Sequence, residues 1–562
     1  MPFEVPEREA EIGVLPAEPI DLFLRYVPYD VVDRWAEWTN AAGLTAQRRP
    51  LRRRSRSKLW RPTSAHEIYL FLGILICMGL HTESQISSYW STSQDQEDPI
   101  YLFTRFMSRD RFQLLLRRLR IFNPADFPDI TTTTPSQQRS RRGAREDRMP
   151  KVYRQINGWS AHIQATGDSF YTPGSGLTVD EAMIRFTGRS VETTTVPNKP
   201  TPVGFKVWVL AQKGYCLRWL WHVHGQGPYG LVPQARPAWG DEEAKKAALT
   251  PTQRVVTTLV ALLPVAEYHV FLDNLFASVK LFRALRRQNI GATGTCRKDG
   301  GIDDILVGEK EDEGKGIPWG QVHCIPTKDG QINQFTWKDN ALVLFLTTVF
   351  RETAEVLRLR RRPTGDSAAK KEARRVFGAE ARKNLPIPLA IDEYNHNMNG
   401  VDTSDQMRSY HQYSRPIRRG SWQALAWNFL LEVVLVNTFF LQLWGDPNWP
   451  KVKSQYQWRR TLSTQLIQQF GPSADARTRA RPKRATDTRN DVIPWVHHTR
   501  ERRKNPSPCV ACNYSRRKSR VALGEVTANT RRRKQSRSGC RQCGVALCTT
   551  DECWYLYHNQ NI

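Results

Sequence analysis

Four aspartates occupy positions from which their carboxylates can meet. Asp180 stands inside the apolar run LTVDEAMI, where a solvated acid is not expected, and Asp273 ends the apolar run YHVFLD. Asp402 and Asp405 lie three residues apart at the start of a helical pattern, so they share one face of that helix. Grouped carboxylates repel one another and tend to take up protons, whereas divalent cations reverse that balance. The four residues therefore indicate a site for Mg²⁺ or Mn²⁺, and two such ions can clamp an in-line phosphoryl displacement.

Each of these aspartates also has a structural explanation when it is taken alone. Asp273 can cap the helix that follows it, and Asp402 and Asp405 can be acids of a first helical turn, where the helix dipole favours them. Because the acids fall at matching points of one strand order, we favour the metal site.

A second group of candidate metal ligands lies near the end of the chain. Six of the ten cysteines crowd into the last tenth of the sequence: Cys509, Cys512, Cys540, Cys543, Cys548 and Cys553. Both thiolates of a C-x2-C pair can reach one tetrahedral zinc ion, and this chain has two such pairs. Two zinc ions need eight ligands, of which His558 is the seventh and His497 or His498 the eighth. The spacing leaves open which ligands share an ion.

The elements that position the acids follow from the hydrophobic period. Alternating patterns predict strands, and three- and four-residue spacing predicts helices over about 242–263 and 275–288. The resulting order, β-β-β-α-β-α-β, is that of a ribonuclease-H-like domain. In that order the first strand neighbours the strand after the crossover, which brings Asp180 and Asp273 to one edge of the sheet. The predicted strands are 177–184, 204–212, 216–225, 268–273 and 291–297.

The flanking regions differ from this core in pattern. Helical spacing runs from 21 to about 123 and again from 401 to about 444. We expect the acidic, proline-rich residues 1–20 to be flexible. Residues 298–385 are irregular and are expected to be an insertion with strands in FTWKDNALVLFLTTVF and a mobile basic segment at 357–377.

Composition and charge narrow the class of partner. The net charge is +28 and the pI about 9.9, which favours a polyanion such as nucleic acid. Residues 68–80 are too short to cross a bilayer, and polar residues interrupt the apolar run 422–444, which we interpret as a core helix. The first residues have no signal-peptide layout. We therefore expect a soluble intracellular protein with no membrane partner.

Several long segments resemble the piggyBac transposase family, in the family's order. FLGILICMGLHTESQISSYWST (71–92) and FMSRDRFQLLLRRLRIFN (106–123) resemble its helical domain, and PNKPTPVGFKVW (197–208) resembles its Lys-Pro and Gly-Phe-Lys stretch. The segments around the acids are similar to its three aspartate motifs. These are LTVDEAMIRFTGRS (177–190), VFLDNLFASVKLFRALRRQNIGATGTCRKD (270–299) and YNHNMNGVDTSDQMRSYHQYSRPIRRGSWQALAWNFLLEVVLVNTF (394–439).

The resemblance implies cut-and-paste transposition of double-stranded DNA, from transposon ends into TTAA targets. It implies that Asp180, Asp273 and Asp402 are the catalytic triad, with Asp405 a supporting acid. It also implies a homodimer in the nucleus and two zinc ions in the cysteine-rich domain. The candidate DNA-binding residues are Lys199, Lys206, Arg516, Arg517, Lys518, Arg531, Arg532 and Arg533. The alternative is a domesticated DNA-binding protein that keeps the fold without cutting.

These arguments give one expected organisation, a mixed α/β chain whose ribonuclease-H-like core follows an all-α domain and precedes a zinc-bound one. The expected divisions are a tail (1–20), a helical dimerisation and DNA-binding domain with a basic linker (21–170), the core's first part (171–297), an insertion (298–385), the core's second part (386–460), a basic linker (461–495) and the cysteine-rich domain (496–562).

Overall fold

The structure is a computed structural model that divides into two compact units, Met1–Pro472 and Ser473–Ile562. Each unit is described by itself. The described residues are 2–48, 60–91, 101–127, 149–186, 188, 190–197, 199–223, 227–231, 247–351, 354–366, 368–413, 423–472, 499–512, 535–541, 543 and 545–559.

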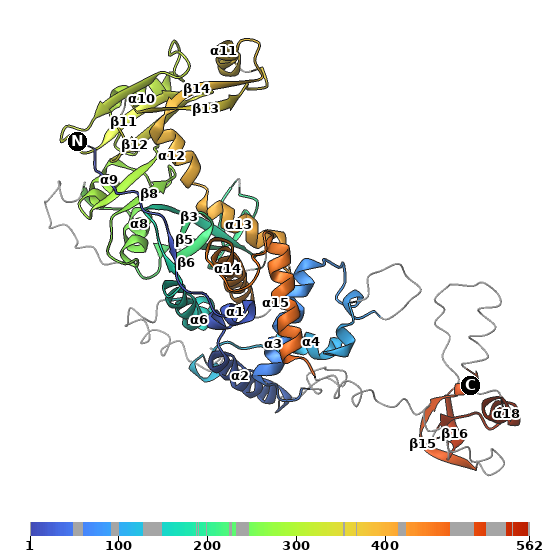
Figure 1. Cartoon of the computed structure of the whole chain (residues 1–562). Helices are drawn as coiled ribbons and strands as arrows, with labels where there is room; N and C mark the ends of the chain where they lie inside the picture. The colour runs from blue at the N-terminus through green and yellow to red at the C-terminus, as the bar shows by residue number, and fades with distance from the viewer. Residues whose placement is uncertain are drawn as a thin grey trace. The chain divides into compact units, whose positions relative to one another are not determined.

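A ten-stranded mixed sheet runs through the first unit (Figure 1). Its order is β10-β11-β12-β9-β8-β3-β5-β6-β7, and β4 pairs with β5. The strands are β3 (Gly176–Arg185), β4 (Thr194–Thr195), β5 (Val203–Gln212), β6 (Tyr215–Val223), β7 (Gly227–Pro228), β8 (Tyr268–Leu272), β9 (Ile290–Thr295), β10 (Val322–Pro326), β11 (Asn333–Lys338) and β12 (Leu342–Thr347).

The middle of the sheet has the predicted strands in the predicted order. β3, β5 and β6 are antiparallel, whereas β3, β8 and β9 are parallel. The crossovers contain α8 (Pro251–Ala261) and α9 (Val279–Arg286). The tight turn between β5 and β6 has positive φ at both Lys213 and Gly214, which is the geometry that two-residue hairpin turns require.

Helices from both ends of the first unit pack together beside this sheet. The predicted helical pattern upstream of the core is confirmed, and α3 is almost fully buried. α15 packs along α3, where Ser463 Oγ donates to the Gly73 carbonyl at 2.8 Å. The helices are α1 (Pro19–Tyr26), α2 (Tyr29–Arg48), α3 (Ala65–Leu80), α4 (Arg109–Arg118), α6 (Lys151–Asp168), α12 (Leu389–Asn397), α13 (Gly400–Tyr410), α14 (Gln423–Trp444) and α15 (Gln455–Phe470), with 3-10 turns at Ser88–Trp90, Phe103–Arg105 and Pro124–Asp126.

Among the described residues, one helix is long and apolar enough to cross a membrane, Leu425–Trp444 of α14. In this structure 89% of the residues in the most apolar stretch of this helix are buried within the protein. Trp427 packs against Trp159 of α6, and Asn437 hydrogen-bonds both backbone groups of Cys216 on β6. The segment is therefore packed as the core helix that we predicted.

Three expectations about flanking segments are corrected. Residues 461–470, which we assigned to a basic linker, belong to α15. The basic segment 357–377 is not irregular, because it contains most of β13 (Glu355–Arg361) and all of α11 (Ala368–Phe377). β13 pairs with β14 (Arg382–Pro388), and Arg358 binds both carboxylate oxygens of Asp392. Within the predicted insertion, β10 to β12 continue the central sheet, and the helix α10 (Asp304–Glu311) packs against β11 and β12.

The third correction concerns the acidic N-terminal residues. They are held by backbone hydrogen bonds to the core, in which Phe3 N donates to Thr348 O and Ser175 N donates to Arg8 O. Further along, β1 (Glu11–Ile12) pairs with β2 (Tyr171–Thr172). Residues 2–18 are therefore an ordered strap, because the sheet offers them partners that lie far away in sequence.

The second unit is small and has few apolar residues in its core. It contains β15 (Arg500–Pro508), β16 (Gln535–Cys540), β17 (Val545–Ala546) and α18 (Asp551–Asn559). Cysteines make up three of its five buried core residues. A domain of this size rarely folds on so small an apolar core without a covalent or metal staple.

Candidate active site and candidate metal centres

The sheet register places Asp180 beside Asp273. β3 and β8 are parallel, and Val179 lies opposite Leu272. The residue that follows each of these two is an aspartate, Asp180 after Val179 and Asp273 after Leu272. Asp180 is 6% exposed and Asp273 is half-buried. Asp180 Oδ1 accepts from the Glu181 N–H at 2.7 Å, and Asp273 Oδ1 accepts from the Leu275 N–H at 2.9 Å. Both carboxylates are thus held in fixed orientations by the backbone.

Asp402 reaches the same face of the sheet from the first turn of α13. Thr178 shares a face of β3 with Asp180, because alternate residues of a strand do. The Thr178 hydroxyl donates to the Asn397 carbonyl, and a Cβ on Gly400 would lie 3.1 Å from Thr178 Oγ1. This close packing sets the start of α13 against β3. Asp402 is exposed there.

Asp405 lies one turn further along α13 and is held by Arg408. Arg408 Nη2 donates to Asp405 Oδ1, and its guanidinium stacks on the Phe429 ring at 4.4 Å. Asp402 and Asp405 therefore differ in their surroundings although they share a helix face. Asp402 is exposed and forms no hydrogen bond or ion pair with the described residues, whereas an ion pair with Arg408 fixes Asp405.

The pKa values show that the acids act on one another. Burial raises the pKa of Asp180 well above its ordinary value. The charges of Glu181 and Asp273 raise this pKa further, and the charge of Lys199 lowers it in part. Burial also raises the pKa of Asp273 and of Asp405. Crowded acids of this kind become tolerable when a cation lies among them.

The side chain of Tyr394 lies close enough to three of the acids for their charges to raise its pKa. The pKa of Tyr394, on α12, rises to about 12, first because of burial and then through the charges of Asp273, Asp180 and Asp402. The gathering is loose: in the described part of the chain, no three of these acids have oxygens that all lie within 4.8 Å of one another.

The two predicted lysines lie beside the acids. Lys199 Nζ is 3.6 Å from both Asp180 Oδ2 and Glu181 Oε1. Lys206 Nζ is 3.8 Å from Glu181 Oε2 and lies 3.9 Å from the centre of the Trp208 ring. Glu181 is the acid that both lysines share, a role that was not predicted although the Asp-Glu pair at 180–181 is visible in the sequence. Arg408 was not predicted either, although its three-residue spacing from Asp405 could have indicated it.

A cavity of about 910 Å³ opens beside Asp402 and Asp405. Glu181, Lys199 and Arg408 are also on its polar wall, and apolar side chains of α3, α4, α14 and β3 line it too. Exposed arginines line the cavity too, namely Arg117 and Arg185. The cavity therefore combines acids suited to hard metal ions with cations suited to phosphates.

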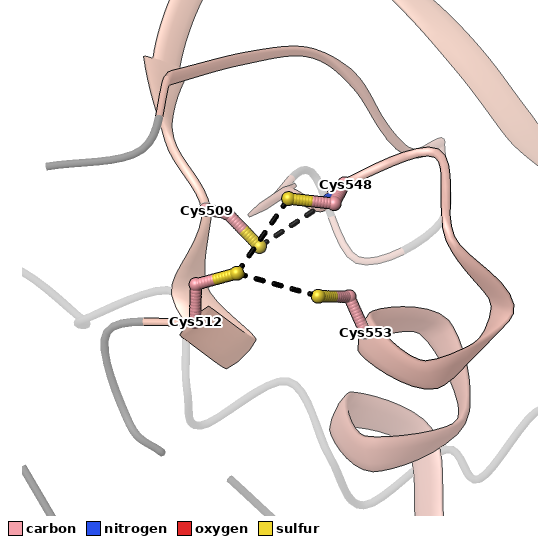
Figure 2. Close-up of side chains that lie close together, drawn as sticks. All are labelled: Cys509, Cys512, Cys548 and Cys553. Carbon is pink, nitrogen blue, oxygen red and sulfur yellow. Dashed lines mark hydrogen bonds between the residues drawn. The ribbon is translucent and has the colours of Figure 1, made fainter. Parts of the chain in front are cut away.

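Four cysteines of the second unit form one metal-ligand cluster (Figure 2). The sulfur atoms of Cys509, Cys512, Cys548 and Cys553 all lie within 4.8 Å of one another. Cys512 Sγ is 3.6 Å from Cys548 Sγ and 3.4 Å from Cys553 Sγ. Four thiolates at this spacing suit tetrahedral zinc.

A second cluster joins Cys540, Cys543 and His558. His558 Nδ1 lies 2.8 Å from the Trp554 carbonyl, which leaves Nε2 facing Cys543 Sγ at 3.7 Å. Ligating histidines are commonly oriented in this way by a backbone carbonyl. The structure thus pairs the first Cys-x2-Cys with Cys548 and Cys553, and the second with His558. His497, His498 and the candidate DNA-binding residues Arg516, Arg517, Lys518, Arg531, Arg532 and Arg533 lie outside the described residues.

Comparison with known proteins finds a family model, a human relative and a solved structure that are similar to this chain. A family model described as Transposase IS4 matches residues 18–439. The human PiggyBac transposable element-derived protein 2 is 25% identical over 456 residues, which cover 80% of this chain. They cover 66% of the relative, so the chain spans just under two thirds of that protein's length. A cryo-EM structure of a piggyBac transposase synaptic complex with hairpin DNA shares the fold, with a TM-score of 0.60, 19% identity and coverage of 95% of this chain and 97% of that one.

Proposed function

The chain belongs to the piggyBac-type transposase family, and from this premise we propose that it cuts and rejoins DNA by metal-dependent phosphoryl transfer. The observation that carries the proposal is the β3–β8 register, which sets Asp180 beside Asp273 while α13 brings Asp402 to the same face of the sheet. Acids that are brought together from three distant segments are typical of a functional site, and burial raises the pKa of two of them, Asp180 and Asp273.

We infer that the middle of the sheet is a ribonuclease-H-like core. The antiparallel β3-β5-β6 meander followed by parallel β8 and β9 with helical crossovers supports this inference. In such a core the first two acids meet where β8 ends beside the middle of β3, and the third acid comes from a helix that follows the insertion.

The donor set fits Mg²⁺ or Mn²⁺. Asp180, Asp273 and Asp402 offer carboxylate oxygens, which these hard ions prefer, and the open surroundings of Asp402 leave room for water and substrate. When bound, two such ions would supply charge stabilisation to the attacking and leaving oxygens of a phosphodiester.

The chain's own residues orient the ligands and the DNA. Backbone N–H groups fix Asp180 and Asp273, and Arg408 keeps Asp405 in a supporting position. The cations around the cavity, Lys199 and Arg185 among them, are placed to contact phosphates of the DNA.

We propose that the second unit binds two zinc ions and contributes to DNA binding. Cys509, Cys512, Cys548 and Cys553 would hold one ion, and Cys540, Cys543 and His558 would hold the other with His498 as the fourth ligand. From Ser473 to the end the sequence has 20 Lys and Arg against 7 Asp and Glu, an excess of positive charge that suits a phosphate backbone. Recognition of TTAA targets, a homodimer and a nuclear location belong to the same proposal.

The alternative is a domesticated DNA-binding protein that no longer cuts. The similarity to a human protein named as transposable element-derived favours it, since such a chain could keep its fold for another use. The presence of all four aspartates favours cutting, because binding alone gives no chemical reason to keep them.

Cleavage of end-labelled DNA distinguishes the two functions. The full chain is incubated with Mg²⁺ and DNA that carries the ends of its own element, beside the Asp273→Ala variant and the matched surface variant Asp329→Ala. We expect cleavage by the wild type and by Asp329→Ala only. DNA binding without cleavage by all three would establish the alternative, and equal cleavage by all three would refute the assignment of Asp273.

A further inference from the structure

The ammonium group of Lys199 lies where a cation is needed among the acids. Lys199 Nζ is 3.6 Å from Asp180 Oδ2, 3.6 Å from Glu181 Oε1 and 3.5 Å from the Glu181 carbonyl oxygen. Asp402 and Asp405 line the same cavity. A single lysine thus offsets part of the repulsion that the acids would otherwise suffer.

The loop that carries Lys199 is held in shape. It joins β4 to β5, and the Val196 N–H donates to the Pro202 carbonyl at 2.8 Å to close it. Prolines at positions 197, 200 and 202 restrict its backbone further. The side chain of Lys199 is 28% exposed, so its flexible stem can turn toward the cavity without movement of the loop.

Lys206 differs from Lys199 in both contacts and freedom. Its side chain is 10% exposed, it stacks on Trp208, and the ion pair that it forms is to Glu181. Lys206 is therefore a fixed partner of Glu181, whereas Lys199 contacts the proposed metal ligand Asp180 itself.

We propose that Lys199 is the resident counter-ion of the metal site, which competes with the divalent cations for Asp180 and is displaced when they bind. The proposal rests on the proposed function, because it takes Asp180 as a metal ligand. A divalent ion and an ammonium group on one carboxylate repel each other, so metal binding drives Lys199 away from Asp180. The displaced ammonium then faces the cavity, where a DNA phosphate can take the place of Asp180 as its partner.

Manganese binding tests this competition without any measurement of activity. Mn²⁺ is titrated into the full, zinc-loaded chain, and the free ion is followed by electron paramagnetic resonance. Lys199→Met removes the competing charge and is expected to bind Mn²⁺ about tenfold more tightly than the wild type. Lys199→Arg keeps the charge and is expected to stay within about threefold of the wild type.

Two control variants test whether a change in Mn²⁺ affinity comes from Lys199 and from the site at the acids. Lys213→Met removes the same charge at a lysine whose side chain is 57% exposed and pairs with Glu9, and it is expected to leave Mn²⁺ affinity unchanged. Asp273→Asn is expected to weaken Mn²⁺ binding both in the wild type and in each lysine variant. That result would show that the ion binds at the acids. Circular dichroism and zinc content confirm that each variant is folded.

The outcomes separate this proposal from the proposed function. If Lys199→Met and the wild type bind Mn²⁺ equally at a site that needs Asp273, or if Lys199→Met binds it more weakly, Lys199 is not a competitor and the metal site stands. If neither protein binds Mn²⁺, removal of Lys199 uncovers no site, and both the counter-ion and the metal assignment fail. Tighter binding by Lys199→Met with an unchanged Lys213→Met control supports both.

Discussion

Replacement of Asp180 by asparagine is expected to stabilise the protein when no divalent ion is bound. Asp180 is 6% exposed, and burial, followed by the charges of Glu181 and Asp273, raises its pKa. An ionised carboxylate in this place therefore destabilises the folded chain near neutral pH. Asparagine has nearly the same shape and carries no charge, and it can still accept from the Glu181 N–H.

The magnitude follows from the link between pKa and stability. A tenfold change in the proton affinity of one group corresponds to about 1.4 kcal/mol. Because Lys199, 3.6 Å away, offsets part of the cost of burial, we expect a gain of about 1–3 kcal/mol for Asp180→Asn at neutral pH. A substitution in a proposed active site would thus raise stability while it abolishes cleavage.

The pH dependence has a definite sign. Asp180 holds its proton to a higher pH in the folded chain than in the unfolded chain, so the folded state binds more protons between the two pKa values. The stability of the metal-free wild type therefore rises as the pH falls through the raised pKa of Asp180 toward its ordinary value of 3.8. Asp180→Asn lacks this contribution and should show a smaller slope.

Urea denaturation followed by tryptophan fluorescence measures both effects, with and without Mg²⁺. The control is Asp30→Asn, since Asp30 is 73% exposed and pairs only loosely with Arg34, and a change within about 0.5 kcal/mol is expected. Mg²⁺ should stabilise the wild type and not Asp180→Asn, because a ligand stabilises only the state that binds it. A metal-free Asp180→Asn variant that is less stable than the wild type, or equal stabilisation of both by Mg²⁺, would refute the reasoning.

Three further predictions concern other parts of the molecule. Cys512→Ser should lower the zinc content measured by mass spectrometry from about two ions per chain to about one, and an unchanged content would rule out the four-cysteine cluster. Arg459→Leu leaves Glu432 buried without its partner and should cost about 3–5 kcal/mol in urea denaturation, most of which the double variant with Glu432→Leu recovers; a double variant no more stable than Arg459→Leu would contradict this. In a single-turnover assay, Asp402→Asn should reduce DNA cleavage at least about a hundredfold, whereas Asp405→Asn should reduce it only about tenfold. Equal losses in the two variants would contradict the different roles that we assign to these aspartates.

The positions of the acids could be predicted because they depend on local patterns and one topological rule. The alternation in LTVDEAMI defines β3, and the apolar run that ends at Asp273 defines β8. A crossover between them makes the strands parallel neighbours, and the register then follows from where each run begins and ends. The turn between β5 and β6 is likewise a local feature, because Gly214 tolerates the positive φ that it adopts there.

Other features depend on contacts between distant residues and left no local signal. The strap at 2–18 is ordered by backbone hydrogen bonds to partners that lie far away in the sequence, such as Thr348. Residues 461–470 of α15 were assigned to a basic linker, yet Leu462 and Leu466 are fully buried in this helix. Arg459 is paired there with Glu432 of α14, and no local pattern identifies a partner on another helix.

The zinc clusters show the same limit in another form. Regular spacing of the cysteines predicted the ligands, but it could not predict that Cys548 and Cys553 join the first pair while His558 joins the second. That choice depends on how α18 folds back on the strands. The central position of Lys199 likewise depends on a loop that closes in three dimensions.

Location of the bound metal tests the central claim most directly. Crystals or cryo-EM samples of the full chain with Mn²⁺ and DNA from its own element's ends would show the ions, by anomalous scattering in the crystal. We expect two manganese ions roughly 4 Å apart, held by Asp180, Asp273 and Asp402, with Lys199 turned away from Asp180. Manganese bound elsewhere, with the carboxylates of these three aspartates pointing to separate surfaces, would contradict it.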